Sequence, residues 1–306
     1  KKANQFRVYE DKPQHYDNWD VDIYYNRKFW DVTDVKEIKW VENGPVRAAL
    51  YVKKAVSNSM IEQTIYFYAD EPRIDFDTHV DWKDYQQLLK VHFPVDIHTD
   101  EATFDIQFGN LTRKTHKNTS WDIARFETCG HKWMDVSEGG YGVSILNDCK
   151  YGHSVDHSDI GLTLIKSGIE PNPTTDQEDH YFTYAIYPHA GTWREANTLQ
   201  EGYDLNQPVL AVNGTAQNSE YSFISCDKNN GMLETVKPAE DGNGIIIRVI
   251  EEKNTKTKAK LHFAQEVKSI CECDLMENKV ADMYAKGQDV CITIAPYEIK
   301  TYRVNF

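Results

Sequence analysis

Carboxylates alternate with aromatic rings near the start of the chain. Asp17, Trp19 and Asp20 lie in the stretch DNWDVDIYYNRKFW, which also contains Tyr24 and Trp30. Aromatic faces can cover the apolar C–H patch of a sugar ring, while carboxylates accept hydrogen bonds from its hydroxyls. The stretch therefore predicts a sugar-binding surface at Asp17, Trp19 and Asp20. The alternative is a strand whose aromatic residues are core and whose aspartates are solvated.

A second candidate site is a polar turn that directly follows the apolar run at residues 143–146. The turn has the sequence NDCKYGH, and four of its residues offer side-chain or main-chain contacts to a ligand: Asn147, Lys150, Tyr151 and Gly152. A strand that ends in a loop of donors, acceptors and an aromatic ring is a common way to present a polar ligand with its partners. We expect these residues to bind substrate.

Two further groups resemble metal or redox sites. One is the segment HSVDHSD, which places His153, Asp156, His157 and Asp159 within seven residues. The other is a C-x-C pair, Cys271 and Cys273, whose thiols would point to one face of a strand. The alternative for HSVDHSD is a polar loop without a ligand, and the alternative for the two cysteines is that they simply fill space within a β-layer. We predict no metal site in this chain. No Gly-x-Ser-x-Gly elbow and no glycine-rich phosphate loop is present.

Composition restricts the partners. The 306 residues carry 48 acidic and 34 basic side chains, a net charge of −14, so we expect no nucleic-acid partner. No apolar run approaches the roughly 20 residues of a membrane helix, and we expect no membrane partner. Six scattered cysteines predict a reducing compartment, the cytoplasm, rather than a disulfide framework. The chain starts without methionine, and we expect it to be a fragment.

Period-two alternation dominates the chain, and helical periodicity is nearly absent. Segments with the strand pattern are residues 62–68, 73–82, 88–97, 103–108, 160–165, 181–187, 221–224, 245–250, 258–263, 290–294 and 298–304. Polar turns separate them, which predicts an all-β fold with a large antiparallel sandwich. Linker-like sequence near residue 210 predicts two domains, a large β-sandwich over residues 1–210 and a smaller one over residues 211–306.

Longer motifs carry a family resemblance. The chain resembles the C-terminal region of bacterial-type glycoside hydrolase family 38 α-mannosidases. The matching motifs include YDNWDVDIYY, PRIDFDTHVDW, HKNTSWDIARFE, HKWMDVSEGGYGVSILNDCKYGH, FTYAIYPHAGTWREA and LETVKPAEDGNG, in that order along nearly the whole chain.

The resemblance implies a galactose mutarotase-like large sandwich followed by a small C-terminal sandwich. Family members begin with an α/β barrel that holds a divalent metal, usually zinc, and both catalytic carboxylates. This chain would then contain no catalytic residue and no cofactor. It would pack on the barrel, present an exposed apolar or aromatic patch, and help to bind an α-mannoside oligosaccharide.

The expected activity of the intact enzyme is retaining hydrolysis of terminal α-linked mannose, with this chain inactive alone. Two alternatives are a free-standing carbohydrate-binding module and a mutarotase-like sugar epimerase. The sequence does not determine the oligomeric state, and a homo-oligomer is compatible with it. The alternative for the two predicted site segments, residues 17–20 and 147–153, is a purely structural role in which they seal the interface between domains.

Overall fold

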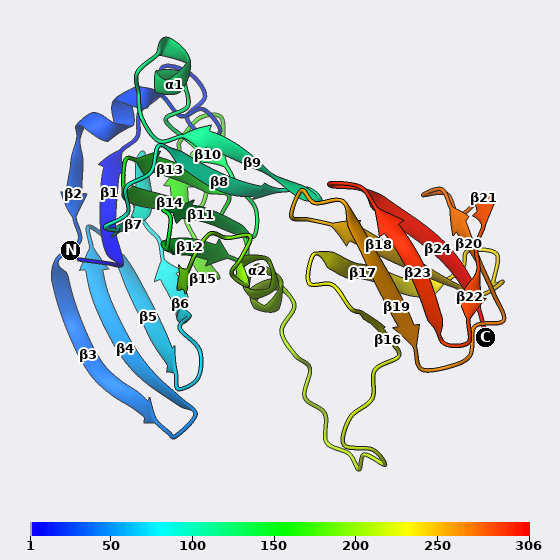
Figure 1. Cartoon of the computed structure of the whole chain (residues 1–306). Coiled ribbons are helices and arrows are strands. Elements are labelled where there is room, and N and C mark those ends of the chain that lie inside the picture. Colours follow the sequence, from blue (N-terminus) through cyan, green and yellow to red (C-terminus); the bar gives the residue numbers. More distant parts are fainter. Residues whose placement is uncertain (1) are drawn as a thin grey trace. The chain divides into compact units, whose positions relative to one another are not determined.

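The structure is a computed structural model that describes residues 2–306 (Figure 1). Nearly all regular structure is antiparallel β-sheet, which confirms the predicted all-β class. Contacts divide the chain into two compact units. The first comprises residues up to Ile106 together with Leu111–Val209, and the second comprises Gln107–Asn110 and Leu210–Phe306.

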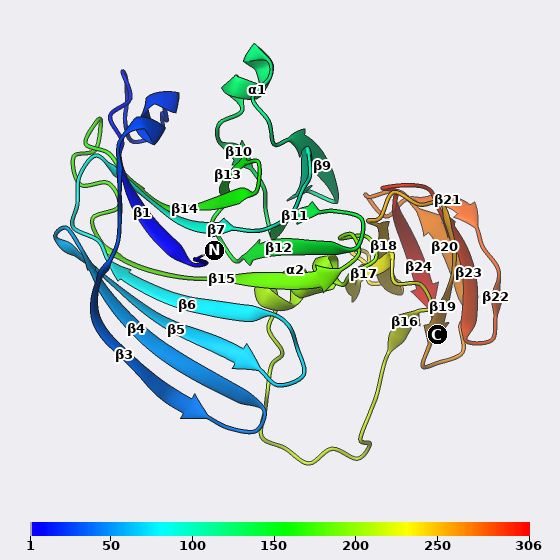
Figure 2. The same cartoon turned by 60° about the vertical axis from the view of Figure 1, so that its left-hand side comes forward.

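The first unit is a sandwich of two antiparallel sheets, which Figure 2 shows as two layers. The six-stranded sheet has the order β10 (Thr128–Cys129), β13 (Gly152–Asp156), β14 (Asp159–Ser167), β7 (Gln87–Pro94), β1 (Gln5–Glu10) and β2 (Phe29–Asp31). The nine-stranded sheet has the order β3 (Asp34–Asn43), β4 (Arg47–Val56), β5 (Ser59–Tyr68), β6 (Ile74–Asp81), β15 (Asp179–Ala190), β12 (Tyr141–Asn147), β11 (Trp133–Ser137), β8 (Glu101–Ile106) and β9 (Gly109–Lys114).

Large aromatic side chains from both sheets fill the core of the first unit. Phe76 and Tyr184 are opposite each other on β6 and β15, and their rings stack with centroids 5.0 Å apart. Phe93 enters from β7 of the other sheet, with its ring 5.7 Å from that of Phe76. Because successive side chains of a strand point to opposite faces, the neighbours of Phe93 on β7 face away from this core.

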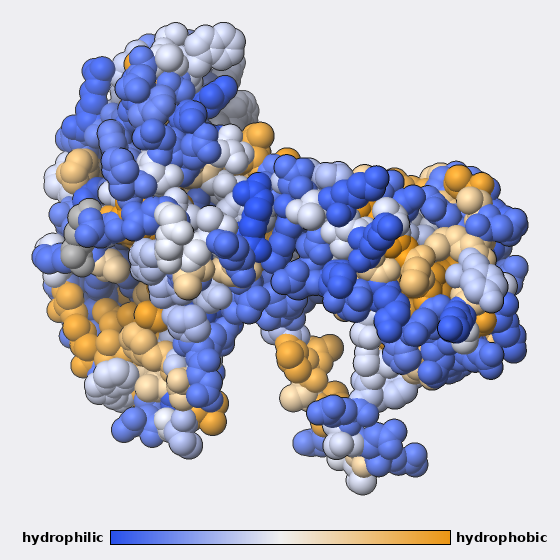
Figure 3. Space-filling model, viewed as in Figure 1, coloured by the Kyte–Doolittle hydropathy of each residue, from blue (hydrophilic) through white to orange (hydrophobic). Residues whose placement is uncertain are grey.

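The edge strand β3 exposes apolar residues. Nine of its ten residues are exposed, among them Val35, Ile38 and Trp40, and Val46 follows in the turn to β4. Figure 3 shows hydrophobic surface over this edge of the first unit. The structure thus has an exposed apolar patch of the kind that the sequence predicts.

Among residues 2–306, three short helices interrupt the β-structure, and the strand pattern predicts none of them. They are η1 (Ile23–Arg27), α1 (Ser120–Ala124) and α2 (Thr198–Asn206). A capping box begins α1, since the Thr119 hydroxyl accepts from the Asp122 amide while the Asp122 carboxylate accepts from the Thr119 amide. No helix among residues 2–306 combines the length and the apolar character needed to cross a membrane.

The second unit is a smaller sandwich. Its four-stranded sheet has the order β16 (Ile224–Cys226), β19 (Thr257–Phe263), β23 (Asp289–Ile294) and β22 (Ala285–Lys286). Its five-stranded sheet has the order β17 (Gly231–Pro238), β18 (Ile245–Glu251), β24 (Ile299–Asn305), β20 (Ser269–Cys273) and β21 (Lys279–Asp282). On β19 buried and exposed residues alternate strictly, as the period-two pattern predicts.

Several predicted strand boundaries are displaced. The pattern predicts a strand over residues 221–224, but the strand is Ile224–Cys226, and Tyr221 is exposed. The strand expected over residues 103–108 ends at Ile106, because Phe108 adopts a positive φ of 54° in the turn to β9. Segment boundaries of this kind depend on turn geometry rather than on hydrophobic alternation.

Candidate functional site

Asp17 anchors the N-terminal aromatic segment to the loop that follows β14. It is buried, and its Oδ1 accepts hydrogen bonds from the amides of Ile169 (2.8 Å) and Glu170 (2.7 Å). Its Oδ2 accepts a third hydrogen bond, from the Gln86 side chain. Burial raises the pKa of Asp17, but these hydrogen bonds outweigh it, so the net pKa is lowered. Asp17 therefore fixes the position of its neighbours.

Trp19 and Asp20 are the exposed part of the same segment. Trp19 stacks on Tyr16, with ring centroids 5.4 Å apart and an angle of 20° between the planes. Its side chain remains 63% exposed, and Asp20 is exposed beside it. A ring and a carboxylate held next to each other in solvent are available to a polyhydroxylated ligand.

The turn after β12 combines one buried residue with exposed ones. Asn147 is fully buried; its Oδ1 accepts from the Lys150 amide (2.8 Å), and its Nδ2 donates to the His131 carbonyl (2.7 Å). Asn147 thus closes the turn. Tyr151 is about half exposed, and the Lys150 ammonium lies over the Phe182 ring.

The two predicted segments contact different positions, one on β14 and one in the loop directly after it. Gly152 lies against Thr163, since a Cβ there would be 3.0 Å from the Thr163 Cβ, whereas the backbone of Asp17 lies against Gly168. Five residues of extended chain span roughly 16 Å at about 3.3 Å per residue. The segments therefore provide two separate contact points rather than one cluster.

The four residues of HSVDHSD do not gather into a metal site. His153 is buried against Phe104, Asp156 forms an ion pair with Lys117, and the side chain of His157 is solvent-exposed. Asp159 is paired instead with His92 and Arg7. Asp156 and Asp159 are cross-strand partners and share one face, whereas His153 lies on the core face against Phe104, so the four side chains do not converge on one point.

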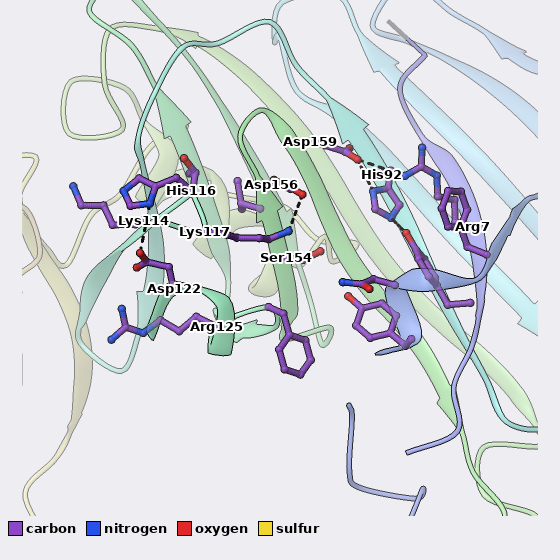
Figure 4. Close-up of a pocket in the computed structure, with 17 residues that line it drawn as sticks. Arg7, His92, Lys114, His116, Lys117, Asp122, Arg125, Ser154, Asp156 and Asp159 are labelled. Atoms are coloured by element: carbon purple, nitrogen blue, oxygen red, sulfur yellow. Dashed lines mark hydrogen bonds and ion pairs between the residues drawn. The ribbon is translucent and has the colours of Figure 1, made fainter. Parts of the chain in front are cut away.

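No pattern in the sequence predicts the polar face of the six-stranded sheet, which paired side chains from neighbouring strands organise. Arg7 and Tyr9 on β1 lie beside Lys90 and His92 on β7, opposite the core. The Tyr9 hydroxyl is 2.8 Å from His92 Nε2, and His92 Nδ1 is 3.2 Å from a carboxylate oxygen of Asp159. Figure 4 shows the row formed by Arg7, His92 and Asp159.

Burial shifts the proton affinities of this row. It lowers the pKa of His92, against the opposing influence of the Asp159 carboxylate, so the neutral imidazole is favoured. It raises the pKa of Tyr9 to about 12, so this hydroxyl keeps its proton. The row therefore combines two neutral hydrogen-bonding groups, Tyr9 and His92, with the Arg7 guanidinium and the Asp159 carboxylate.

A buried ion pair lies beside the row. Lys90 has no exposed side-chain surface and pairs with Glu127, while the Tyr25 hydroxyl donates to Glu127 (2.6 Å). The Lys90 ammonium also donates to Ser154 Oγ at 2.7 Å. Burial lowers the pKa of Lys90, and Glu127 opposes that effect. These contacts tie η1, β7 and β13 together beneath the surface.

A cavity of about 180 Å³ opens above these residues, between η1 and the α1 segment (Figure 4). Its carboxylates are Asp122, Asp156 and Asp159, and its cationic side chains are Arg7, Lys114, Lys117 and Arg125. The hydrogen bond from Thr119 lowers the pKa of Asp122. An ionised Asp122 accepts hydrogen bonds and does not supply the proton that an acid catalyst must donate.

Comparison with known families covers both units. Residues 1–174 match the model described as the glycosyl hydrolases family 38 C-terminal domain, and residues 230–302 match that of the family 38 C-terminal beta sandwich domain. The chain belongs to the C-terminal region of family 38. The family prediction is therefore confirmed.

Individual sequence relatives agree with this family assignment. The family 38 chain is 38% identical over 318 residues to alpha-mannosidase G of Dictyostelium discoideum and 35% identical over 306 residues to alpha-mannosidase 2C1 of Homo sapiens. These matches cover 98% and 97% of this chain but only 29% of each relative. The chain thus spans less than a third of the length of the curated relatives it matches.

The fold also matches a solved structure. The alpha-mannosidase from Enterococcus faecalis V583 superposes with a TM-score of 0.80 at 17% identity, over 99% of this chain and 39% of that one. At this identity the match establishes the fold alone. The galactose mutarotase-like description of the large sandwich stays a prediction.

Family 38 α-mannosidases are generally metal-dependent. Among the described residues of this family 38 chain, the side chains of Asp176, Glu178 and His180 bring ligand atoms within 4.8 Å of one another. His180 Nε2 already hydrogen-bonds to the Asp176 carbonyl, and Glu178 is exposed. We assign no metal to this loop, and the absence of a metal site from the chain stays a prediction.

The C-x-C pair lies on β20 of the second unit. The Sγ atoms of Cys271 and Cys273 are 3.8 Å apart, so both thiols share one face, as predicted. Burial raises the pKa of Cys273 to about 11, which keeps it protonated and unreactive near neutral pH. The arrangement fits the alternative that the two cysteines fill space within a β-layer.

Proposed function

We propose that this chain is the C-terminal, non-catalytic portion of a retaining α-mannosidase that hydrolyses terminal α-linked mannose. The observation that carries the proposal is the family match in both units, together with relatives named alpha-mannosidase. The catalytic carboxylates and a divalent metal, zinc, belong to the part of the protein outside this chain. When bound there, the metal supplies positive charge to sugar hydroxyls.

The role of this chain is to position substrate. Of the predicted residues, Trp19, Asp20, Lys150 and Tyr151 have surface available to an α-mannoside oligosaccharide. Asp17, Asn147 and Gly152 hold these residues in place, since Asp17 and Asn147 direct their hydrogen bonds into the protein and Gly152 lies against Thr163. Small misplacements of positioning groups are costly in rate, so both sets contribute to activity.

The cytoplasm is the compartment we propose for this protein. The support is chemical: all six cysteines are free in the structure, and two of them lie within 4 Å of each other without a bond. A reducing environment maintains thiols in this state.

The test compares two proteins in one assay. An aryl α-mannoside is incubated with the longer protein encoded by the gene and, separately, with the 306-residue chain. We expect turnover by the longer protein and none by the chain. Turnover by the chain at a comparable rate, or none by the longer protein under any divalent metal, would overturn the proposal.

A further inference from the structure

Strand β3 is an open edge of the nine-stranded sheet. It pairs with β4 on one side, and among residues 2–306 no strand lies on its other side (Figure 2). A strand in this position presents a row of amide and carbonyl groups that can pair with another strand. Natural proteins usually shorten such an edge or interrupt it with proline. This edge is ten residues long and contains no proline, which is typical of a surface that another strand covers.

The two faces of β3 differ in chemistry. Ile38 is opposite Val52 of β4, which is buried, so Ile38 and Trp40 lie on the core-facing side of the sheet, where both remain exposed. Glu37 and Lys39 lie on the other side and form an ion pair of 2.8 Å. The strand thus presents an apolar inner face and a charged outer face.

The regular part of β3 is short. Its pairing with β4 is irregular between Val35 and Glu37 and again between Trp40 and Glu42, which leaves residues 37–40 as an uninterrupted stretch. Bulges bend a strand and increase its twist, so a further strand can pair with β3 only along this stretch. The side chains at these four positions therefore decide which strand fits.

One antiparallel register of two β3 strands satisfies both faces. A slip of one residue moves every side chain to the other face, so Ile38 must lie opposite an inner-face residue of the second strand. When it lies opposite Ile38 of a second copy, Glu37 of each strand lies opposite Lys39 of the other. A slip of two residues in either direction places Glu37 opposite Glu37 or Lys39 opposite Lys39, which is unfavourable.

We propose that β3 pairs in antiparallel orientation with β3 of a second copy of this chain, centred on Ile38, so that the two nine-stranded sheets become continuous. The charges select a second copy as the occupant, because the Glu37 and Lys39 pattern is complementary to itself under a two-fold axis. Such an interface is closed, since each copy uses its only β3 edge. The pairing goes beyond the proposed function and does not depend on α-mannosidase activity.

Sedimentation velocity of the 306-residue chain over a range of concentrations measures this association. A short strand pair buries less area than a standard interface, so we expect a weak dimer with a dissociation constant of about 10–100 μM. Glu37→Lys and Lys39→Glu should each raise this constant by about tenfold or more, because two-fold symmetry makes each substitution create two like-charge contacts. The double variant Glu37→Lys/Lys39→Glu should restore the constant to within about threefold.

A mixture of the two single variants tests the register directly. In an equimolar mixture of Glu37→Lys and Lys39→Glu, one strand carries lysine at both positions and the other carries glutamate at both. Every lysine then lies opposite a glutamate, so the mixture should form a heterodimer at a concentration at which each variant alone is monomeric. A purely apolar association would not distinguish the mixture from its components.

The control is Lys114→Glu on β9, the opposite edge of the same sheet. Lys114 also pairs with a glutamate, Glu101, and its side chain is 46% exposed, against 53% for Lys39. This substitution should leave the dissociation constant within about twofold, and thermal unfolding shows whether each variant keeps its fold.

Three results would overturn the proposal. They are a monomer at every concentration up to about 1 mM, a dimer that both single variants leave unchanged, and a mixture of the single variants that does not associate. A fourth would come from the longer protein. If that protein is monomeric and its β3 amides are protected from hydrogen exchange, the rest of its own chain covers β3 and a second copy does not.

Discussion

Lys90 and Glu127 form an ion pair in which the lysine has no exposed surface and the glutamate side chain is 18% exposed. Tyr25 and Thr163 donate further hydrogen bonds to the glutamate. Two charges removed from water are stable together only because each compensates the other. The pair joins β7 to the segment before β10, beneath the cavity.

Lys90→Met should therefore lower the free energy of unfolding by about 3–5 kcal/mol, because it leaves the Glu127 carboxylate without its cation. The double variant Lys90→Met/Glu127→Leu should recover part of that loss, since no charge then remains buried. Urea denaturation of both single variants and the double variant gives the coupling energy. Equal stability of Lys90→Met and the unmodified chain would show that the pair is not needed.

His153 makes stability depend on pH. It is fully buried, and burial lowers its pKa to about 4, below the value near 6.5 of an exposed histidine. Between these two pH values the unfolded chain binds a proton at His153 that the folded chain does not. The contribution of His153 to the free energy of unfolding is therefore complete above about pH 6.5 and is lost as the pH falls towards 4. The shift corresponds to about 3 kcal/mol.

His153→Leu should remove this contribution, and the dependence of unfolding free energy on pH between 6.5 and 4 should flatten by about one proton. His157→Asn is the matched control, because its side chain lies in solvent at the β13–β14 turn. The prediction fails if both variants retain the pH slope of the unmodified chain.

Gly168 is the point where the N-terminal segment meets the loop after β14. A Cβ at this position would lie 2.5 Å from the backbone carbonyl carbon of Asp17 and 2.7 Å from the backbone nitrogen of Asn18. Backbone atoms cannot move aside as a side-chain end can, so Gly168→Ala should destabilise the chain by about 1–3 kcal/mol. Gly139→Ala meets nothing within 4 Å and should be nearly neutral. The stabilities of the two variants are compared through their denaturation midpoints.

Trp19 tests the proposed role of the exposed ring. In the longer protein, Trp19→Ala should lower kcat/KM for an α-mannoside oligosaccharide by about threefold to tenfold, which corresponds to loss of one aromatic contact. Trp121→Ala removes a ring of similar exposure, 75%, from α1 and should leave kcat/KM unchanged. Equal effects of the two substitutions would argue against a sugar contact at Trp19.

Local pattern was sufficient to predict the class of the fold and about half of the strands among residues 2–306. Alternation on β19 and the apolar run on β12 predict strands correctly, because burial of one face is a local property of the sequence. The longer sequence motifs were sufficient to identify the family. The strands that the pattern does not predict include β3, which is exposed along nearly its whole length, and β4, which is only partly buried.

The site itself required the tertiary structure. Spacing alone could suggest Asp17 and Asn147 as ligand contacts, yet burial and hydrogen bonds make them anchors for Trp19 and the Lys150 turn. The polar face depends on β7 pairing with β1 on one side and β14 on the other. Such pairings join residues more than 60 positions apart, and no local periodicity encodes them. The sequence by itself determined the β-class and the family, and the register of three distant strands decided where His92, Asp159 and Arg7 meet.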